Sequence, residues 1–135
     1  MISIILDTNV LISGLFWGGP PMKILNAVGD NKLCLVTTDE IFEEYTKVIK
    51  RSALKFSRPQ LLPISDLFKH HIHYTFPFHL LNPVSRDPDD DKFIACALGS
   101  GCKLIVSGDK DLLEVSGFAG IEIIKPKTFI EKYVE

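Results

Sequence analysis

Short apolar runs alternate with longer helical patterns along this chain. Each run is rich in β-branched residues and is bounded by turn-forming residues, which is typical of strands that are covered on both faces. The four runs are Ile2–Leu6, Leu33–Val36, Leu104–Val106 and Ile121–Ile124. Because strands that alternate with helices form right-handed crossover units, the pattern predicts a mainly parallel sheet between two helical layers.

Turn and capping residues predict where the helices begin and end. Gly18-Gly19-Pro20-Pro21 breaks the first helical pattern, and Thr37 with Glu40 has capping-box spacing, with Thr38 as the alternative cap. The predicted helices are one that ends before Gly18, Met22–Val28, one from Thr37 or Thr38 to about Lys50, one from Ser57 through Lys69, one from Asp87 to near Gly99, and a short one from Pro126.

The segment His71–Phe76 alternates polar and apolar residues, which predicts an edge strand with one wet face. The alternative is a catalytic role for the histidines, because paired histidines can act as general acid and general base without a metal. The histidines in question are His70, His71, His73 and His79.

Length and composition indicate one globular domain over residues 1–135. The chain is 46% apolar, which indicates either a core buried on both faces or an oligomer contact, and we expect a homodimer. The net charge of −2 lacks the basic excess of most nucleic-acid-binding domains, so any such binding must be local or metal-assisted.

Cysteine spacing and hydropathy exclude several other classes of protein. Cys34, Cys96 and Cys102 form no Cys-x-x-Cys pair, so neither a disulfide framework nor a zinc site is indicated. The chain opens without a basic leader, and no apolar run approaches the roughly 18 residues of a membrane span. We therefore expect a cytoplasmic protein that does not bind membranes.

Three acids occupy positions that should converge. Asp7 and Asp109 follow predicted strands, and Asp91 lies at the start of the helix that leads into the second of them. Taken singly, each acid has a simpler explanation as a helix cap. Since the carboxyl ends of parallel strands share one edge of a sheet, where ligands bind, their joint placement indicates a site.

Two further acids lie on helix faces that can reach the same edge. Glu44 flanks the apolar stripe of the third helix, either reaching inward or remaining at the solvent boundary. In the run Asp87-Pro88-Asp89-Asp90-Asp91, the helix dipole alone favours acids. Asp90 and Asp91 both align with apolar positions of that helix, so helical geometry does not choose between them.

Clustered carboxylates require a proton or a cation. At about 5 Å and an effective dielectric constant near 20, two carboxylates repel by roughly 3 kcal/mol. Oxygen ligands without histidine or cysteine favour Mg²⁺ or Mn²⁺, which suit phosphoryl transfer because they neutralise phosphate charge.

Four motifs, in order along nearly the whole chain, resemble the PIN domain family. They are Ile4-Ile5-Leu6-Asp7-Thr8-Asn9-Val10, Glu44 in the third helix, the segment from Asp87 to Ala95, and Ile105-Val106-Ser107-Gly108-Asp109-Lys110-Asp111-Leu112-Leu113. The resemblance is closest to toxins of toxin–antitoxin pairs. It implies a three-layer α/β/α sandwich, RNA cleavage with Mg²⁺ or Mn²⁺, and a small antitoxin protein as partner.

The resemblance also implies roles for individual residues. The catalytic metal ligands map to Asp7, Glu44, Asp91 and Asp109. Asp111 is implied as an assisting ligand, Asp90 as a supporting acid, and Asn9 as a group that orients Asp7. The position of Ser107 is commonly threonine in the family, and serine keeps the hydroxyl. The products implied are a 5′-phosphate and a 3′-hydroxyl.

Basic and aromatic residues are candidates for RNA contacts. Lys47, Lys50 and Arg51 share a helix face that suits RNA phosphates, although cations also complement a helix C-terminus. Phe16 and Trp17 are placed either to stack on a base or to form core or dimer contacts.

Two other functions remain open. A metal-dependent phosphatase also places Asp after the first strand, but the haloacid-dehalogenase pattern requires a second Asp where this chain has Asn9. A non-catalytic PIN-like module that binds RNA or protein is the second alternative.

Overall fold

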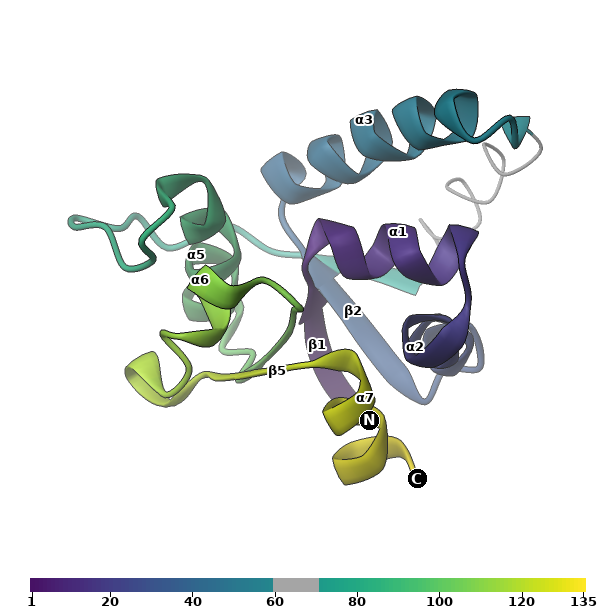
Figure 1. Ribbon diagram of the computed structural model, residues 1–135. Coiled ribbons are helices and arrows are strands. Elements are labelled where there is room, and N and C mark those ends of the chain that lie inside the picture. Colours follow the sequence, from purple (N-terminus) through teal and green to yellow (C-terminus); the bar gives the residue numbers. More distant parts are fainter. Residues whose placement is uncertain (60–70) are drawn as a thin grey trace.

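A five-stranded sheet forms the centre of the molecule (Figure 1). The computed structural model describes residues 1–59 and 71–135. The strands are β1 (Ile2–Leu6), β2 (Leu33–Thr37), β3 (Ile72–Tyr74), β4 (Leu104–Val106) and β5 (Glu122–Ile124). They pair in the order β3-β2-β1-β4-β5, and each pair is parallel, as predicted.

Helices cover both faces of this sheet. The longer ones are α1 (Thr8–Phe16), α2 (Gly19–Gly29), α3 (Asp39–Lys55) and α5 (Asp91–Ser100). Shorter elements are η3 (Pro88–Asp90), α6 (Lys110–Leu113), η4 (Phe118–Gly120), α7 (Pro126–Phe129) and η5 (Ile130–Val134).

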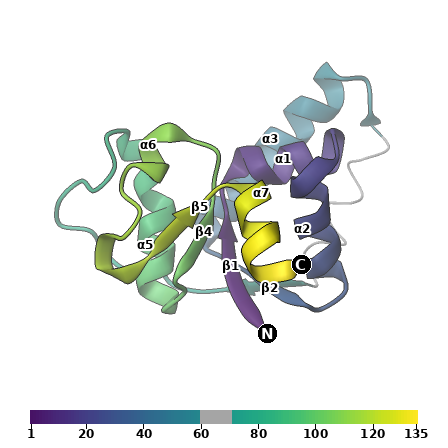
Figure 2. The same cartoon turned by 60° about the horizontal axis from the view of Figure 1, so that its bottom comes forward.

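The connections divide the helices into two layers. The chain passes from β1 through β2 to β3 and then returns to β4 and β5, so right-handed crossovers place α1 to α3 on one face and α5 and α6 on the other. Figure 2 shows β1, β4 and β5 side by side, with α7 beside α2. The predicted α/β/α sandwich is therefore confirmed.

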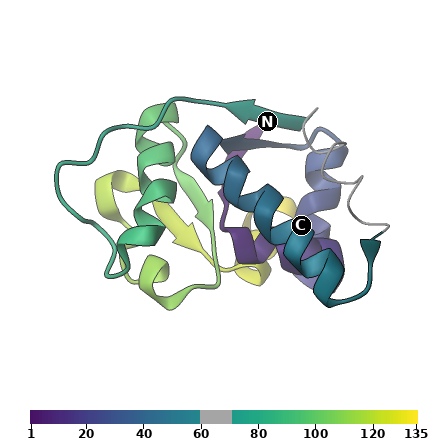
Figure 3. The same cartoon turned by 90° about the horizontal axis from the view of Figure 1, so that it is seen from above.

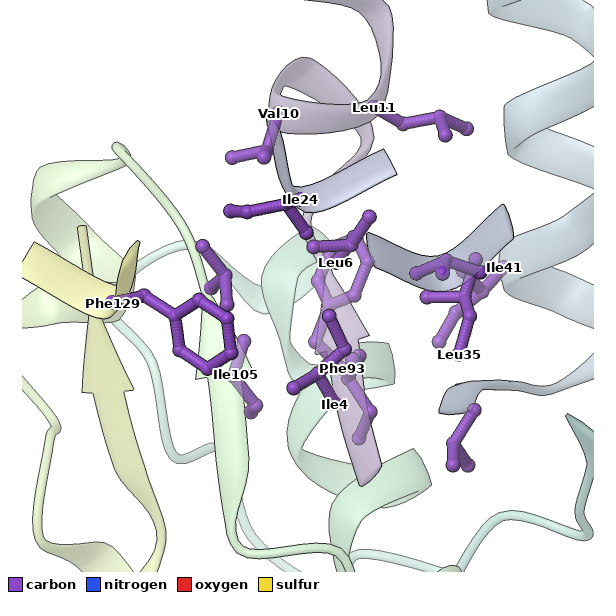
Figure 4. Close-up of a cluster of buried hydrophobic side chains, with 14 of the residues drawn as sticks. Ile4, Leu6, Val10, Leu11, Ile24, Leu35, Ile41, Phe93, Ile105 and Phe129 are labelled. Atoms are coloured by element: carbon purple, nitrogen blue, oxygen red, sulfur yellow. The ribbon is translucent and has the colours of Figure 1, made fainter. Parts of the chain in front are cut away.

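The core surrounds β1, which has helices on both sides (Figure 4). Ile4, Ile5 and Leu6 are completely buried, and Ile24 of α2 and Phe93 of α5 belong to the same cluster. Burial on both faces explains why this strand appears in the sequence as a continuous apolar run instead of an alternating one.

Several predicted boundaries differ from the structure. Helix α2 begins at Gly19, before the predicted Met22. Gly18 and Gly19, with φ of 90° and 71°, make the turn that leads into the helix, and proline is compatible with a first helical turn. The cap of α3 is Thr38, whose side chain accepts from Ile41 N at 3.3 Å, so the capping box at Thr37 is wrong.

The end of α3 also differs, since the helix continues to Lys55 instead of stopping near Lys50. Ser52 and Ala53 are buried, and this packing carries the helix past the basic residues at 50 and 51. The helix predicted from Ser57 through Lys69 lies mostly outside the described residues. The predicted edge strand is confirmed by β3, which pairs with β2 at the end of the sheet.

The segment after β3 packs closely against α5. Phe78 N donates to Ala95 O at 2.9 Å, and the backbone of Phe76 approaches Gly99 so closely that a Cβ on Gly99 would overlap the Phe76 carbonyl oxygen. Gly99 is therefore required by a backbone contact and not by its own conformation.

We expect Gly99→Ala to destabilise the protein by about 1–3 kcal/mol, because the added methyl group forces a backbone shift. Gly29→Ala is the matched control, since a Cβ at Gly29 would meet nothing within 4 Å. Thermal melts should show a lower Tm for Gly99→Ala and an unchanged or slightly higher Tm for Gly29→Ala. Equal melting of Gly99→Ala and wild type would contradict the close approach.

Candidate metal centre

The register of β1 against β4 brings the first acid to the second strand end. Leu6 pairs with Val106, and the next residues, Asp7 and Ser107, face each other. Ser107 Oγ donates to Asp7 Oδ2 at 2.7 Å and accepts from Asp109 N at 2.9 Å. One hydroxyl thus links the two strand-end acids, and both it and Asp7 are buried.

Helix capping does not explain these acids. Asp7, Asp90 and Asp109 precede α1, α5 and α6, yet none of the three side chains makes a capping hydrogen bond. Thr38 and Asp87, in contrast, do cap α3 and η3. Capping therefore does not account for the position of these three carboxylates.

Three carboxylates form a compact group at this edge. One oxygen from each of Asp90, Asp109 and Asp111 lies within 4.8 Å of the others, and all three side chains are partly exposed. Burial, a hydrogen bond with Asp109, and the negative charges of Asp109, Asp7 and Asp87 raise the pKa of Asp90 to about 7. Mutual repulsion therefore extends beyond the three acids of the group.

Asp7 is close enough to feel the negative charge of this group. Its burial raises the pKa of its carboxyl, the hydrogen bond from Ser107 lowers it, and the charges of Asp109 and Glu44 raise it again. The net direction is upward, because desolvation is the largest effect. A cation at this edge would relieve the cost of both charges.

The structure does not place Asp91, a ligand implied by the resemblance, in this group of three carboxylates. Asp91 Oδ2 accepts from Val84 N at 3.1 Å, and Oδ1 accepts from Ser85 N at 2.7 Å. Both carboxylate oxygens therefore hold the preceding loop. Asp90, one residue earlier, faces Asp109 instead.

Glu44 lies near Asp7 but is bound by other residues. Its Oε1 accepts from Lys92 Nζ at 2.6 Å, and its Oε2 accepts from the hydroxyl of Thr8. The Lys92 side chain is only 7% exposed and also lies 3.4 Å from Asp89. Burial lowers the pKa of Lys92, but the hydrogen bonds and charges of Glu44 and Asp89 outweigh it and raise the pKa overall.

Sequence reasoning missed Lys92 and Thr8. Lys92 follows directly after the acidic run, where helix-dipole arguments offer no reason for a cation, and Thr8 looked like an ordinary first residue of a helix. Their partner Glu44 lies 48 and 36 residues away in the sequence. A lysine one position after a suspected metal ligand was the available signal.

The remaining predicted residues lie around the group. Asn9 is exposed and lines a hollow with Gly108 and Asp109, while the hydroxyl of Ser107 donates to Asp7. Lys47 and Arg51 border a second hollow with Lys92, and Lys50 is exposed on the same helix.

The histidines and the two aromatic residues of the sequence analysis lie at different places in the structure. His71 and His73 lie at β3, His79 lines a hollow with Lys92, and His70 lies outside the described residues. Phe16 is core, whereas Trp17 is 60% exposed.

The donor set fits a divalent cation of the hard type. The carboxylate group consists of oxygen donors, and within residues 1–59 and 71–135 it includes no histidine or cysteine. Its partial exposure leaves room for water or substrate oxygens. The fold and this site together define an α/β/α protein with an acidic centre at the carboxyl edge of its parallel sheet.

A family model described as PIN domain matches residues 3–111, and the chain belongs to this family. PIN domains are usually nucleases that use divalent metals, so at a coarse level the chain is grouped with the hydrolases. No curated protein matches the chain. Across the described residues, the helices fall short of the length and apolarity needed to cross a membrane.

We expect Asp90→Asn and Asp91→Asn to change metal-free stability in opposite directions. Removing the charge of Asp90 relieves repulsion and should raise the Tm in EDTA. Asn at 91 retains only one acceptor oxygen for two backbone donors and should cost about 1–3 kcal/mol. Melts of both variants beside exposed Asp89→Asn test this, and a rise for both would restore Asp91 to the cluster.

Metal-free stability should also depend on pH through Asp90. A carboxyl whose pKa is higher in the folded state than in the unfolded state binds a proton on folding, so the free energy of unfolding falls as pH rises from about 4 to about 7. Chemical denaturation in EDTA at several pH values should show this slope in wild type. It should be shallower in Asp90→Asn, and parallel curves would exclude Asp90 as its origin.

Proposed function

We propose that this protein is a ribonuclease that hydrolyses RNA phosphodiester bonds with Mg²⁺ or Mn²⁺ as its cofactor. The main support is the group of Asp90, Asp109 and Asp111, whose oxygens lie within 4.8 Å at the carboxyl edge of the sheet of a PIN domain. Such a group is electrostatically costly until a cation shares it.

The residues around this edge suit distinct tasks. Asp90, Asp109 and Asp111 would hold the cation, with Asp7 fixed beside them by Ser107. When bound, a divalent cation acts as a Lewis acid that neutralises phosphate charge and activates water. Asp91 serves as a positioning residue, because it fixes the loop at Val84 and Ser85 that leads to Asp90.

Glu44 and Lys92 complete the proposed site. Lys92 and Thr8 hold the Glu44 carboxylate beside Asp7, so its charge adds to the negative field. The Lys92 ammonium is nearly buried and paired with Glu44 and Asp89, which suits it to fix these two carboxylates at the edge of the site.

We further propose that the nuclease is the cytoplasmic toxin of a toxin–antitoxin pair, with a small antitoxin protein as partner. Resemblance to that branch of PIN domains supports this role. A homodimer belongs to the same proposal, supported by the apolar share of the chain and by the exposure of Phe76, Phe78 and Leu81.

Purified protein should cleave single-stranded RNA in Mg²⁺ or Mn²⁺, and EDTA should stop the reaction reversibly. The expected products carry 5′-phosphate and 3′-hydroxyl ends, which can be identified by end-labelling and gel electrophoresis. Cleavage that persists in EDTA and leaves 2′,3′-cyclic phosphates would overturn the metal-dependent mechanism and point to the histidines.

Asp7→Asn, Asp90→Asn and Asp109→Asn should each lower the cleavage rate at least about a hundredfold, since each change removes a charge that would hold or orient the cation. Asp30→Asn is the matched control, because Asp30 caps the end of α2 before β2 and lies at the opposite edge of the sheet. Equal losses in the control and the three variants would mean that the site is misplaced.

A further inference from the structure

The second half of α3 carries positive charge without compensating acids. Residues 45–59 contain five Lys and Arg residues and no Asp or Glu, in a chain whose net charge is −2. Lys47, Arg51 and Lys55 recur at every fourth residue, so they share one face of the helix. All three are exposed, and we name them the cationic stripe.

This stripe begins at the acidic site. Glu44 lies one turn before Lys47, and a hollow of about 400 Å³ lies at this part of α3. The acids Glu40, Glu43 and Glu44 line its start, and the cations Lys47, Arg51 and Lys92 line the rest. Lys47 is paired only loosely with Glu43, at 3.9 Å and with both side chains mostly exposed, and such pairs contribute little. Positive charge thus leads away from the carboxylates along a hollowed surface.

An exposed aromatic platform lies at the other end of the stripe. Trp17 and Phe56 meet edge to face with centroids 4.9 Å apart, and the Arg58 guanidinium lies 5.6 Å from the Trp17 ring. Arg58 Nη1 also donates to Phe16 O at 2.9 Å. These contacts brace Trp17 while 60% of its surface stays exposed, and we name the three residues the Trp17 platform.

The arrangement of α1 and α3 connects these features. Both helices begin at the acidic edge and run away from it side by side (Figures 1 and 3), with contacts from Thr8–Glu44 near the start to Arg58–Phe16 at the far end. From Glu44 to Lys55, α3 rises by about 16 Å. The surface is therefore a path and not a single-phosphate pocket.

We propose that the cationic stripe and the Trp17 platform bind the single-stranded RNA that flanks the cleaved bond. Phosphates lie along Lys47, Arg51 and Lys55, and one base stacks on Trp17, as sequence-tolerant RNA-binding surfaces combine cations with aromatic faces. The charge favours a polyanion over a second copy of this chain, and continuity with the acidic edge favours RNA. This inference extends the proposed nuclease function, but its test does not depend on cleavage.

The first experiment follows Trp17 fluorescence, because Trp17 is the single tryptophan of the chain. Oligouridines of increasing length are added to the full chain in EDTA, where the proposed cleavage is off. Saturable quenching that strengthens with length and weakens with salt is expected. Absence of quenching by every oligonucleotide would overturn the proposal.

Variants then locate the binding surface, with the anisotropy of a labelled oligouridine as readout. Arg51→Gln and Lys55→Gln should each reduce the slope of log Kd against log salt concentration by about one, the loss of one phosphate contact. The exposed Lys32→Gln should leave this slope unchanged. Trp17→Ala should weaken binding by about fivefold or more, and Trp17→Phe should keep most of the affinity because phenylalanine also stacks.

The outcomes separate this inference from the proposed function. Binding that depends on these residues without any cleavage would leave this inference intact and remove the nuclease. Cleavage with an unchanged KM in the stripe variants would do the reverse. If Trp17→Ala instead changes the sedimentation of the protein and leaves the RNA Kd unaltered, the face is a contact between copies, and the proposal fails.

Discussion

Repulsion between carboxylates at the ends of β1 and β4 is the constraint on which the rest of the site depends. Asp7 is buried next to the ends of two strands, and Asp109 and Asp90 lie within its field. The chain tolerates these charges because β1 is packed by apolar residues on both faces and Ser107 fixes the spacing of Asp7 and Asp109. The apolar core thus stabilises the fold, while repulsion between carboxylates destabilises it at the edge where catalysis is expected.

The acidic run before α5 shows how neighbouring residues of one type acquire different roles. Asp87 caps η3, Asp89 pairs with Lys92, Asp90 faces Asp109, and Asp91 holds the loop before the run. A 3-10 turn followed by an α-helix points successive side chains in different directions, so each carboxylate meets a different neighbour.

This geometry also explains what the sequence could and could not predict. The convergence of Asp7 and Asp109 follows from parallel strands ending at one edge, which the spacing of the sequence predicts. The hydrogen bonds of Ser107 with both acids come from the register of β1 against β4. The choice of Asp90 over Asp91 depends on the turn geometry of η3, which an α-helical projection does not contain. The contacts of Glu44 with Lys92 and Thr8 depend on how helices from distant parts of the chain pack, and no local pattern encodes that packing.

The ion pair between Glu44 and Lys92 has a mechanical consequence. Glu44 belongs to α3 and Lys92 to α5, which cover opposite faces of the sheet, so the pair acts as a clasp between the two layers beyond the strand ends. Separating the two helical layers at this position would expose the Lys92 ammonium to solvent, from which it is now almost completely buried. Any ligand that draws either partner away would loosen the clasp, and by linkage the opening of the layers would change affinity for that ligand in return. Slow exchange of the hydrogen-bonded amides beyond the first turns of α3 and α5 would be the signature of an intact ion pair.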